Sequence, residues 1–256
     1  MPASSFEVHF LGEVDSTNDW LLASARAGAP DRTVAVAEFQ RRGRGRLDRK
    51  WEAPPGSALL CSVLLRCRLA PEDRQLATVA VGLAATSACR ELSGAPVALK
   101  WPNDLVVGSR KLGGILAESD GREDDGGAVA LVVGLGVNLT WPGPPEAAGT
   151  SLLEASGVVI ARDALLTAYL EALESRAAAL DDAPARDAMV RDYLDELATI
   201  GHEVRVEQAD GSFTGVATGI TDRGHLVVAQ PDGLRVVTAG DVVHLRRADE
   251  GEGPSE

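Results

Sequence analysis

The chain has 256 residues, of which 45% are hydrophobic, and it carries a formal net charge of −13. This acidity argues against a general nucleic-acid-binding protein, which is usually basic overall, but it leaves room for a local anion site. No apolar stretch approaches the roughly 20 residues that a membrane span needs, and the N-terminus lacks the pattern of a signal peptide.

The three cysteines, Cys61, Cys67 and Cys89, are an odd number without zinc-ligand spacing. A disulfide framework and a structural metal site are therefore both disfavoured, and we expect no metal-ligating set of residues. Free thiols without a signal peptide predict a cytoplasmic protein that has no membrane partner.

Apolar periodicity predicts a mixture of strands and helices up to about residue 200. The capping residues of DSTND precede an apolar-periodic run, so a helix is expected from about 16–18 to Gly28. The run AVALVVGLGVNL at 128–139 is too β-branched and too interrupted by glycine for a helix, and it indicates a central strand. The other strands are expected at 6–14, 33–40, 58–66, 97–101, 104–107 and 113–119, and the other helices at 71–92, 162–181 and 185–198.

The pattern changes after Gly201 to five short strands separated by turn residues. They are expected at 202–208, 212–220, 225–230, 234–239 and 241–246. Such spacing indicates a small β-barrel or sandwich. We therefore divide the chain into a domain of residues 1–199, a C-terminal β domain of residues 200–247 and an acidic tail, 248–256, that is expected to be disordered.

The segment QRRGRGRLDRKW, residues 40–51, places six basic side chains between positions 41 and 50 of an acidic chain. It is neither a GxxxxGK[ST] phosphate loop nor a GxGxxG dinucleotide fingerprint, because the third glycine would fall on Asp48. Its two glycines still let the backbone approach an anion closely, and arginine forks suit phosphate. The alternative is a solvated basic turn or a flexible, protease-sensitive loop.

Two further segments carry polar groups that suit the chemistry of phosphates. In KWPND at 100–104, Pro102 forces an extended turn with Asn103 and Asp104 at its tip, which can orient a ribose or Mg²⁺-bound phosphates. In RKLGGIL at 110–116, Lys111 enters a strand whose glycines let another group come close, so it can stabilise charge that develops in a transfer reaction. The alternatives are an ordinary Asn-Asp turn and an exposed lysine at the end of a strand.

Together these segments resemble those of biotin protein ligases. The matching residues are STN at 16–18, Gln40 with GRGRLDRKW at 43–51, KWPNDL at 100–105, RKLGGIL at 110–116 and GLGVNL at 134–139, in the order and spacing of that family. The resemblance extends from about residue 8 to residue 246. Asp48 stands where many members have glycine, and its carboxylate is expected to reshape the loop or to pair with one of the arginines.

The resemblance implies an α+β fold, in which a mixed β-sheet backed by helices, related to class II aminoacyl-tRNA synthetases, precedes an SH3-like C-terminal barrel. It also implies an enzyme that joins biotin to ATP, supplied as MgATP, with release of pyrophosphate. The biotinyl group of biotinyl-5′-AMP then passes to a lysine on the biotin carboxyl carrier domain of acetyl-CoA carboxylase or a related carboxylase. The matching pattern begins within the first 20 residues, so we expect a short form without the DNA-binding domain of some members, and no DNA partner.

Site roles are implied in the same way. The residues implied for biotin are Ser16, Thr17, Asn18, Gln40, Arg44, Gly45, Arg46, Trp51, Lys111 and Gly114. Those implied for the nucleotide are Arg44, Arg46, Arg49, Trp51, Asn103, Asp104, Lys111 and Asn138. The implied catalytic residues are Arg44, Arg46, Asp104 and Lys111. Cations are needed because a carboxylate must attack a phosphate, and Asp104 is a hypothetical base for the acceptor lysine.

Two other functions stay open at this point. A lipoate or octanoate ligase shares the catalytic fold, although GRGRLDRKW and the C-terminal strands favour biotin. A non-catalytic nucleic-acid-binding module would use the arginine-rich segment and bind in a salt-dependent way. The overall acidity and the few aromatic residues disfavour that module.

Overall fold

A computed structural model describes residues 5–244, apart from 48, 125, 209 and 210. Its main sheet has seven strands in the order β1-β2-β3-β7-β6-β5-β4. These strands are β1 (Glu7–Val14), β2 (Thr33–Gln40), β3 (Ala58–Cys67), β4 (Val97–Lys100), β5 (Asp104–Val107), β6 (Arg110–Glu118) and β7 (Val129–Asn138). Only β1 and β2 pair in parallel, so the sheet is mixed, and β7 occupies its centre as the sequence predicts.

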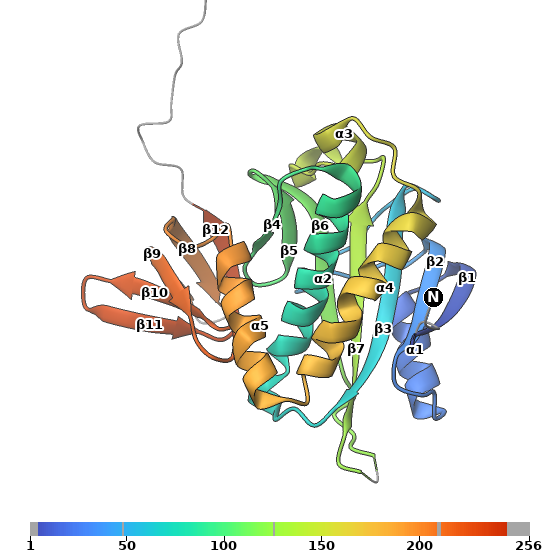
Figure 1. Cartoon of the computed structure of the whole chain (residues 1–256). Coiled ribbons are helices and arrows are strands. Elements are labelled where there is room, and N and C mark those ends of the chain that lie inside the picture. The colour runs from blue at the N-terminus through green and yellow to red at the C-terminus, as the bar shows by residue number, and fades with distance from the viewer. Residues whose placement is uncertain (1–4, 48, 125, 209–210, 245–256) are drawn as a thin grey trace, which may run out of the picture.

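Helices cover both faces of this sheet unequally (Figure 1). The long helices α2 (Gln75–Ser93), α4 (Arg162–Ala179) and α5 (Ala183–Glu196) pack together over one face, whereas α1 (Thr17–Arg26) packs on β2, β3 and β7 from the other. This arrangement confirms the prediction of a mixed sheet backed by helices. No helix within the described ranges is both long enough and apolar enough to cross a membrane.

The central strand β7 shows why the face opposite the long helices has room for a site. Its residues 129, 131, 133, 135 and 137 point into the main core beneath those helices. On the opposite face, Ala130 and Val132 pack under α1, and the next residues with that orientation are Gly134, Gly136 and Asn138. Because side chains alternate along a strand, two glycines in succession leave a trough where α1 ends its cover.

Several element boundaries differ from those predicted. The helix expected from Pro71 is a 3₁₀ turn, Pro71–Asp73, followed by α2 from Gln75; it ends at Gly94, which has a φ of 68°. A short helix α3 (Leu152–Ser156), capped by the Ser151 side chain, was not predicted. The helix expected at 185–198 begins at Ala183, because the Asp182 carboxylate accepts a hydrogen bond from the backbone of Ala185.

All five C-terminal strands are present and form one antiparallel sheet in the order β11-β10-β9-β8-β12. They are β8 (Glu203–Gln208), β9 (Gly211–Ile220), β10 (Leu226–Gln230), β11 (Gly233–Val237) and β12 (Asp241–His244). Within the described residues β11 and β12 are the two edges and do not pair, so a closed barrel is not confirmed. The buried face of this sheet, including Val204 and Val228, is continuous with the core of the main sheet. The predicted tail, 248–256, lies outside the described residues.

Candidate active site

One cavity of about 710 Å³ lies at the trough, between the main sheet, the loop that carries the arginines and the edge of the C-terminal sheet. Every residue predicted for the site lines it: Ser16, Thr17, Asn18, Gln40, Arg44, Gly45, Arg46, Arg49, Trp51, Asn103, Asp104, Lys111, Gly114 and Asn138. Residues separated by more than a hundred positions therefore meet in one place. Their individual roles remain predictions.

At one end of the cavity, amide and hydroxyl groups form a buried polar cluster. Ser16 caps α1, which places Thr17 and Asn18 in its first turn against the sheet. Gln40 Oε1, at the end of β2, accepts hydrogen bonds from the backbone N of Thr17 at 2.8 Å and from its hydroxyl at 2.9 Å. Ser62 Oγ, on β3, lies 2.6 Å from Asn18 Oδ1 and 2.7 Å from Thr17 Oγ1. We call Thr17, Asn18, Gln40 and Ser62 the amide-hydroxyl cluster.

The glycines of β7 are required by the close approach of this cluster and of Trp51. A Cβ on Gly134 would lie 2.4 Å from Asn18 Oδ1. A Cβ on Gly136 would lie 2.6 Å from the Trp51 ring, which crosses the trough between the two ends of the cavity. The indole therefore forms an apolar wall only because position 136 has no side chain.

The arginine loop, residues 41–50, folds back on itself over the cavity. Trp51 N donates to Gly43 O at 3.0 Å and Gly45 N donates to Arg49 O at 2.7 Å. A Cβ on Gly43 would lie 2.4 Å from Trp51 O, so this glycine is needed for the fold of the loop. Asp48, where the chain departs from the family pattern, lies outside the described residues.

The arginines of this loop divide into two groups. Arg41 and Arg42 are exposed and pair with Asp15 outside the cavity, so for these two the solvated alternative describes the structure. Arg44, Arg46 and Arg49 line the cavity, as do residues of the KWPND turn. Only this second group is placed to hold a ligand.

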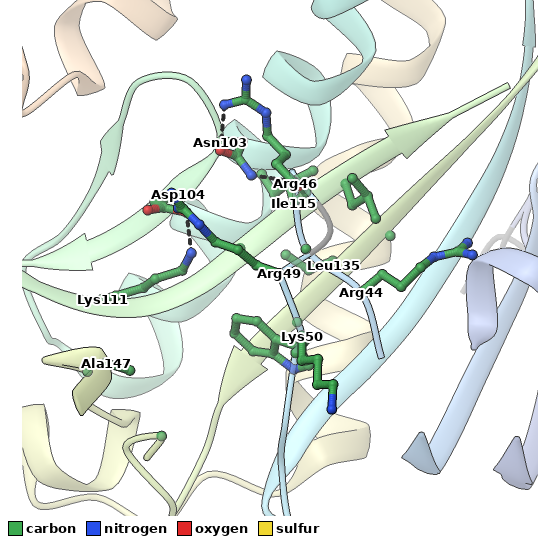
Figure 2. Close-up of a pocket in the computed structure, with 18 of the residues that line it drawn as sticks. Arg44, Arg46, Arg49, Lys50, Asn103, Asp104, Lys111, Ile115, Leu135 and Ala147 are labelled. Carbon is green, nitrogen blue, oxygen red and sulfur yellow. Dashed lines mark hydrogen bonds and ion pairs between the residues drawn. The ribbon is translucent and has the colours of Figure 1, made fainter. Parts of the chain in front are cut away.

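Arg44 and Arg46 point to different sides of the cavity (Figure 2). The Arg44 guanidinium lies 2.6 Å from Asp19 and 2.9 Å from Glu118. Burial alone would lower the pKa of Arg44, but Glu118 and Asp19 outweigh it and raise the pKa above its ordinary value. Burial lowers the pKa of Arg46, against the opposing influence of Asp241.

Lys111 and Asp104 form an ion pair at the other end of the cavity, with Nζ and Oδ1 2.6 Å apart (Figure 2). Lys111 and Gly114 would face opposite sides of a regular strand. The register of β5 and β6 shifts here, since Leu105 pairs with Gly113 but the next residue pairs with Lys111. This bulge turns the Lys111 ammonium toward the face of Gly114, and it lies 5.9 Å from the centre of the Trp51 ring.

The KWPND turn is held from three directions. Asn103 Nδ2 donates to Ile115 O at 2.6 Å, and Asn103 Oδ1 accepts from Arg46 at 3.4 Å. Trp101 is almost fully buried, and its Nε1 donates to Gly224 O of the C-terminal sheet region at 3.0 Å. This turn is therefore fixed to both sheets, and an ordinary exposed Asn-Asp turn does not describe it.

Asn138 lies at the end of β7 and lines the cavity near the loop that follows the strand. Its Nδ2 donates to Thr150 O at 2.9 Å, and the side chain is buried. In the described residues this side chain anchors the loop of residues 140–149, of which Pro142, Gly143 and Pro144 also line the cavity.

Comparison with known proteins gives this geometry a family. A sequence model described as the Biotin/lipoate A/B protein ligase family matches residues 11–138, and one described as the Biotin protein ligase C terminal domain matches residues 199–245. A protein of Mycobacterium tuberculosis named biotin--[acetyl-CoA-carboxylase] ligase is 35% identical to the chain, over 94% of the chain and 90% of that protein. The chain belongs to the biotin protein ligase family. The family predicted from the sequence is thereby confirmed.

Other biotin protein ligases are similar over most of the chain. A bifunctional ligase/repressor of Escherichia coli is 30% identical over 94% of the chain and 75% of that protein. A solved structure described as the biotin protein ligase from Aquifex aeolicus in complex with biotin and ATP has a TM-score of 0.78 at 27% identity, covering 94% of this chain and 99% of that one. The architecture is therefore shared across the main sheet and the C-terminal sheet.

Three residues of the site are not among those predicted: Ser62, Glu118 and Asp241. Ser62 gave a signal, as a lone hydroxyl in the apolar run ALLCSVLLR, where a buried polar group needs a partner. Glu118 ends β6, and Asp241 lies almost 200 positions from the arginines that it meets. Nothing in the local sequence of either carboxylate indicates its partner.

Proposed function

We propose that the chain activates biotin with ATP, which yields biotinyl-5′-AMP and pyrophosphate, and transfers the biotinyl group to a lysine of a carboxylase carrier domain. Relatives from Mycobacterium tuberculosis and Paracoccus denitrificans that are named biotin--[acetyl-CoA-carboxylase] ligase, and an Aquifex aeolicus ligase solved with biotin and ATP, support this activity. The observation that carries it is a single cavity with the amide-hydroxyl cluster at one end and a lysine and two arginines at the other. No observation favours lipoate, octanoate or nucleic acid.

The amide-hydroxyl cluster suits the ureido ring of biotin. That ring offers two N–H donors and one carbonyl acceptor, and it needs partners of both kinds when it is buried. Thr17, Asn18 and Gln40 supply hydroxyl and amide groups that are already fixed by hydrogen bonds to one another or to Ser62. The Trp51 ring and the glycines of the trough would lie along the apolar chain that leads to the biotin carboxylate.

The cationic end brings two anions together. A biotin carboxylate oxygen attacks the α-phosphorus of ATP, the bond to the pyrophosphate oxygen breaks, and negative charge builds up on the phosphoryl oxygens. Lys111 and Arg46 are the cations placed to hold the carboxylate and the α-phosphate. We assign Arg49, Asn103 and Asn138, which line the same cavity, to the further phosphates and the nucleoside. Arg44 and Gly45 cover the junction in this proposal.

Asp104 serves two purposes in the proposal. Its carboxylate holds the Lys111 ammonium at 2.6 Å, and it is an oxygen ligand suited to the Mg²⁺ that enters with ATP. In the second step the acceptor amine attacks the biotinyl carbonyl carbon, AMP leaves, and a proton must be taken from the amine. An unperturbed lysine has a pKa of about 10.4, so a base assists this step, and Asp104 is our candidate.

The remaining predictions stay part of this proposal. We assign residues 1–199 to catalysis and residues 200–247 to an SH3-like domain, which the match to the C-terminal domain of biotin ligases and the five strands support. Cys61, Cys67 and Cys89 are buried and unpaired, which supports a reducing cytoplasm as the compartment.

The test is transfer of label from biotin to a carboxylase carrier domain. Purified protein is mixed with labelled biotin, MgATP and the carrier, and pyrophosphate release and labelled carrier are followed separately. Both are expected, and replacing biotin by lipoate should give neither. Lys111→Ala should reduce pyrophosphate release by about a thousandfold, as removal of a transition-state cation typically does. Arg42→Ala, at an exposed arginine of the same loop that pairs with Asp15 outside the cavity, should have little effect. Label from lipoate and not from biotin would overturn the proposal.

A further inference from the structure

Asp241 is the one carboxylate of the C-terminal sheet that pairs with the arginine loop in the described residues. Oδ2 pairs with Arg49 Nη2, and Oδ1 lies 3.7 Å from Arg46 Nη1. The carbonyl of Gly240 accepts a hydrogen bond from the same Arg46 nitrogen at 3.2 Å. The Asp241 side chain is only 15% exposed. The C-terminal sheet therefore contacts both arginines through the backbone oxygen of Gly240 and the carboxylate of Asp241.

The pairing of β12 with β8 fixes the position of these oxygens. Asp241 opens β12 and stands opposite Glu207 of β8 in the antiparallel register. Gly240 has a φ of 150°, and a Cβ there would lie 2.9 Å from Glu207 O. A residue with a side chain is disfavoured at 240 on both counts, so the turn presents its carbonyl and the next carboxylate at a defined place.

Charge explains why the two arginines need such a group. Arg46 is partly buried and lies near the like charge of Arg49, and both effects lower the pKa of Arg46. Two guanidinium groups in this position repel each other unless an anion lies between them. Asp241 supplies that anion from within the molecule.

Most guanidinium N–H groups of Arg46 and Arg49 are not used in hydrogen bonds with the described residues. A guanidinium has five N–H groups. Among the described residues, Arg46 donates only from Nη1 and Arg49 only from Nη2. The other nitrogens of both side chains make no hydrogen bond to a described residue, so a phosphate could bind them while Asp241 stays in place.

We propose that Asp241 is a positioning residue for the adenylation step, which holds Arg46 and Arg49 over the cavity before the nucleotide arrives. This inference rests on the proposed function, since it gives those arginines to the phosphates of ATP. An ordered loop spares the nucleotide the entropic cost of ordering it. The C-terminal sheet thus contributes directly to nucleotide affinity, beyond its contacts with the main core.

The experiment compares Asp241→Asn with Asp73→Asn. Asp73, in the 3₁₀ turn before α2, also pairs with the C-terminal part of the chain, through Arg223 between β9 and β10 at 3.0 Å, but it does not line the cavity. Steady-state pyrophosphate release is measured against ATP and against biotin. Asp241→Asn should raise the KM for ATP about tenfold, the size expected for a lost hydrogen bond to a charged group, with a kcat within about threefold of that of the parent. Asp73→Asn should leave both constants unchanged, and Asp241→Glu should recover most of the affinity.

A second readout does not depend on turnover. In the absence of ligands, trypsin should cut Asp241→Asn between residues 41 and 50 faster than the parent, while Asp73→Asn should match the parent. If Asp241→Asn does not fold, Asp241→Ser carries the same expectations.

The outcomes separate the two proposals. If the parent protein released no pyrophosphate in the presence of biotin, the proposed function itself would be refuted. An active parent with an Asp241→Asn variant of unchanged KM and unchanged cleavage would overturn the role of Asp241. Equal losses in Asp241→Asn and Asp73→Asn would show that the two sheets merely need to be held together, and would overturn it as well.

Discussion

Ser62 is the most direct test of the polar end of the cavity. Its side chain is fully buried on β3, and its hydroxyl lies 2.6 Å from Asn18 Oδ1 and 2.7 Å from Thr17 Oγ1. The Thr17 proton is already given to Gln40, and Asn18 Oδ1 is an acceptor, so the single Ser62 proton is shared between Thr17 Oγ1 and Asn18 Oδ1. Ser62→Ala removes one donor and almost no volume, which makes it a clean perturbation of the hydrogen bonds.

The expected cost follows from what the substitution leaves behind. A net hydrogen bond contributes about 1 kcal/mol, and a buried acceptor left without a donor raises the total to about 1–3 kcal/mol. We expect the free energy of unfolding to fall by that amount. Because Thr17 and Asn18 lose the group that orients them, the Kd for biotin should rise about tenfold, which corresponds to about 1.4 kcal/mol.

Thr86→Val provides the matched control. Thr86 lies in α2 away from the cavity, its hydroxyl is also buried, and it has no hydrogen-bond partner among the described residues. Replacing an unpaired buried hydroxyl by a methyl group should leave the protein as stable or up to about 1 kcal/mol more stable. Urea unfolding and calorimetric titration with biotin measure both variants. A Ser62→Ala protein with the stability and biotin affinity of the parent would refute the reasoning.

Three further predictions concern other parts of the cavity and its surroundings. Asp104→Asn removes the partner of Lys111 but should slow transfer to the carrier more than it slows formation of biotinyl-5′-AMP; equal loss in single-turnover assays of the two steps would contradict a role as base. Gly136→Ala places a methyl group 2.6 Å from the Trp51 ring and should raise the KM for biotin about tenfold, whereas Gly12→Ala, with open space around it, should not. Burial, above all, lowers the pKa of His244 to about 4. Since an unfolded histidine has a pKa of about 6.5, stability that is present above pH 6.5 is lost as the pH falls toward 4. His244→Gln should flatten urea-unfolding stability in that window, and an imidazole that titrates near 6.5 by NMR would contradict this.

The sequence predicts the strands and long helices well where one local pattern dominates. The near-continuous apolar run at 128–139 indicates a strand buried on both faces, and β7 is the centre of the sheet. The errors fall where several signals compete. Pro71 opens a 3₁₀ turn and not an α-helix, and the caps at Ser151 and Asp182 set boundaries that apolar periodicity alone does not show.

The C-terminal strands illustrate a different limit. Their number and spacing are local properties, and all five are present where the turns indicate. Whether β11 and β12 pair depends on how far the sheet curls, and in the described residues they remain edges. Closure of a sheet is set by twist and shear over the whole unit, which a pattern of short strands does not encode.

For the site, motifs name the ligand-facing residues but not what holds them. Lys111 follows from its motif, whereas its orientation depends on a bulge at Leu112 that brings it to the face of Gly114. Ser62 and Asp241 are likewise supporting groups, contributed by distant strands. Sequence reasoning finds the ligand-facing residues because the reaction restricts their chemical type. It misses the residues that hold them in place because many residue types, at many positions, could make the same contacts.

The acidity of the chain and its arginine loop are therefore parts of one arrangement. Each arginine of the loop has a carboxylate partner before any ligand binds: Asp15 for Arg41 and Arg42, Asp19 and Glu118 for Arg44, and Asp241 for Arg46 and Arg49. Without these local carboxylates the arginines of the loop would repel one another with no anion to offset the repulsion. Resident carboxylates remove that repulsion at three separate points along the loop, so an incoming phosphate meets cations whose positions are already set. Neutralising a carboxylate that pairs with a cavity-lining arginine, such as Glu118 or Asp241, should then weaken nucleotide binding. Simple attraction between protein and phosphate predicts the opposite sign, because the substitution makes the charge around the cavity more positive.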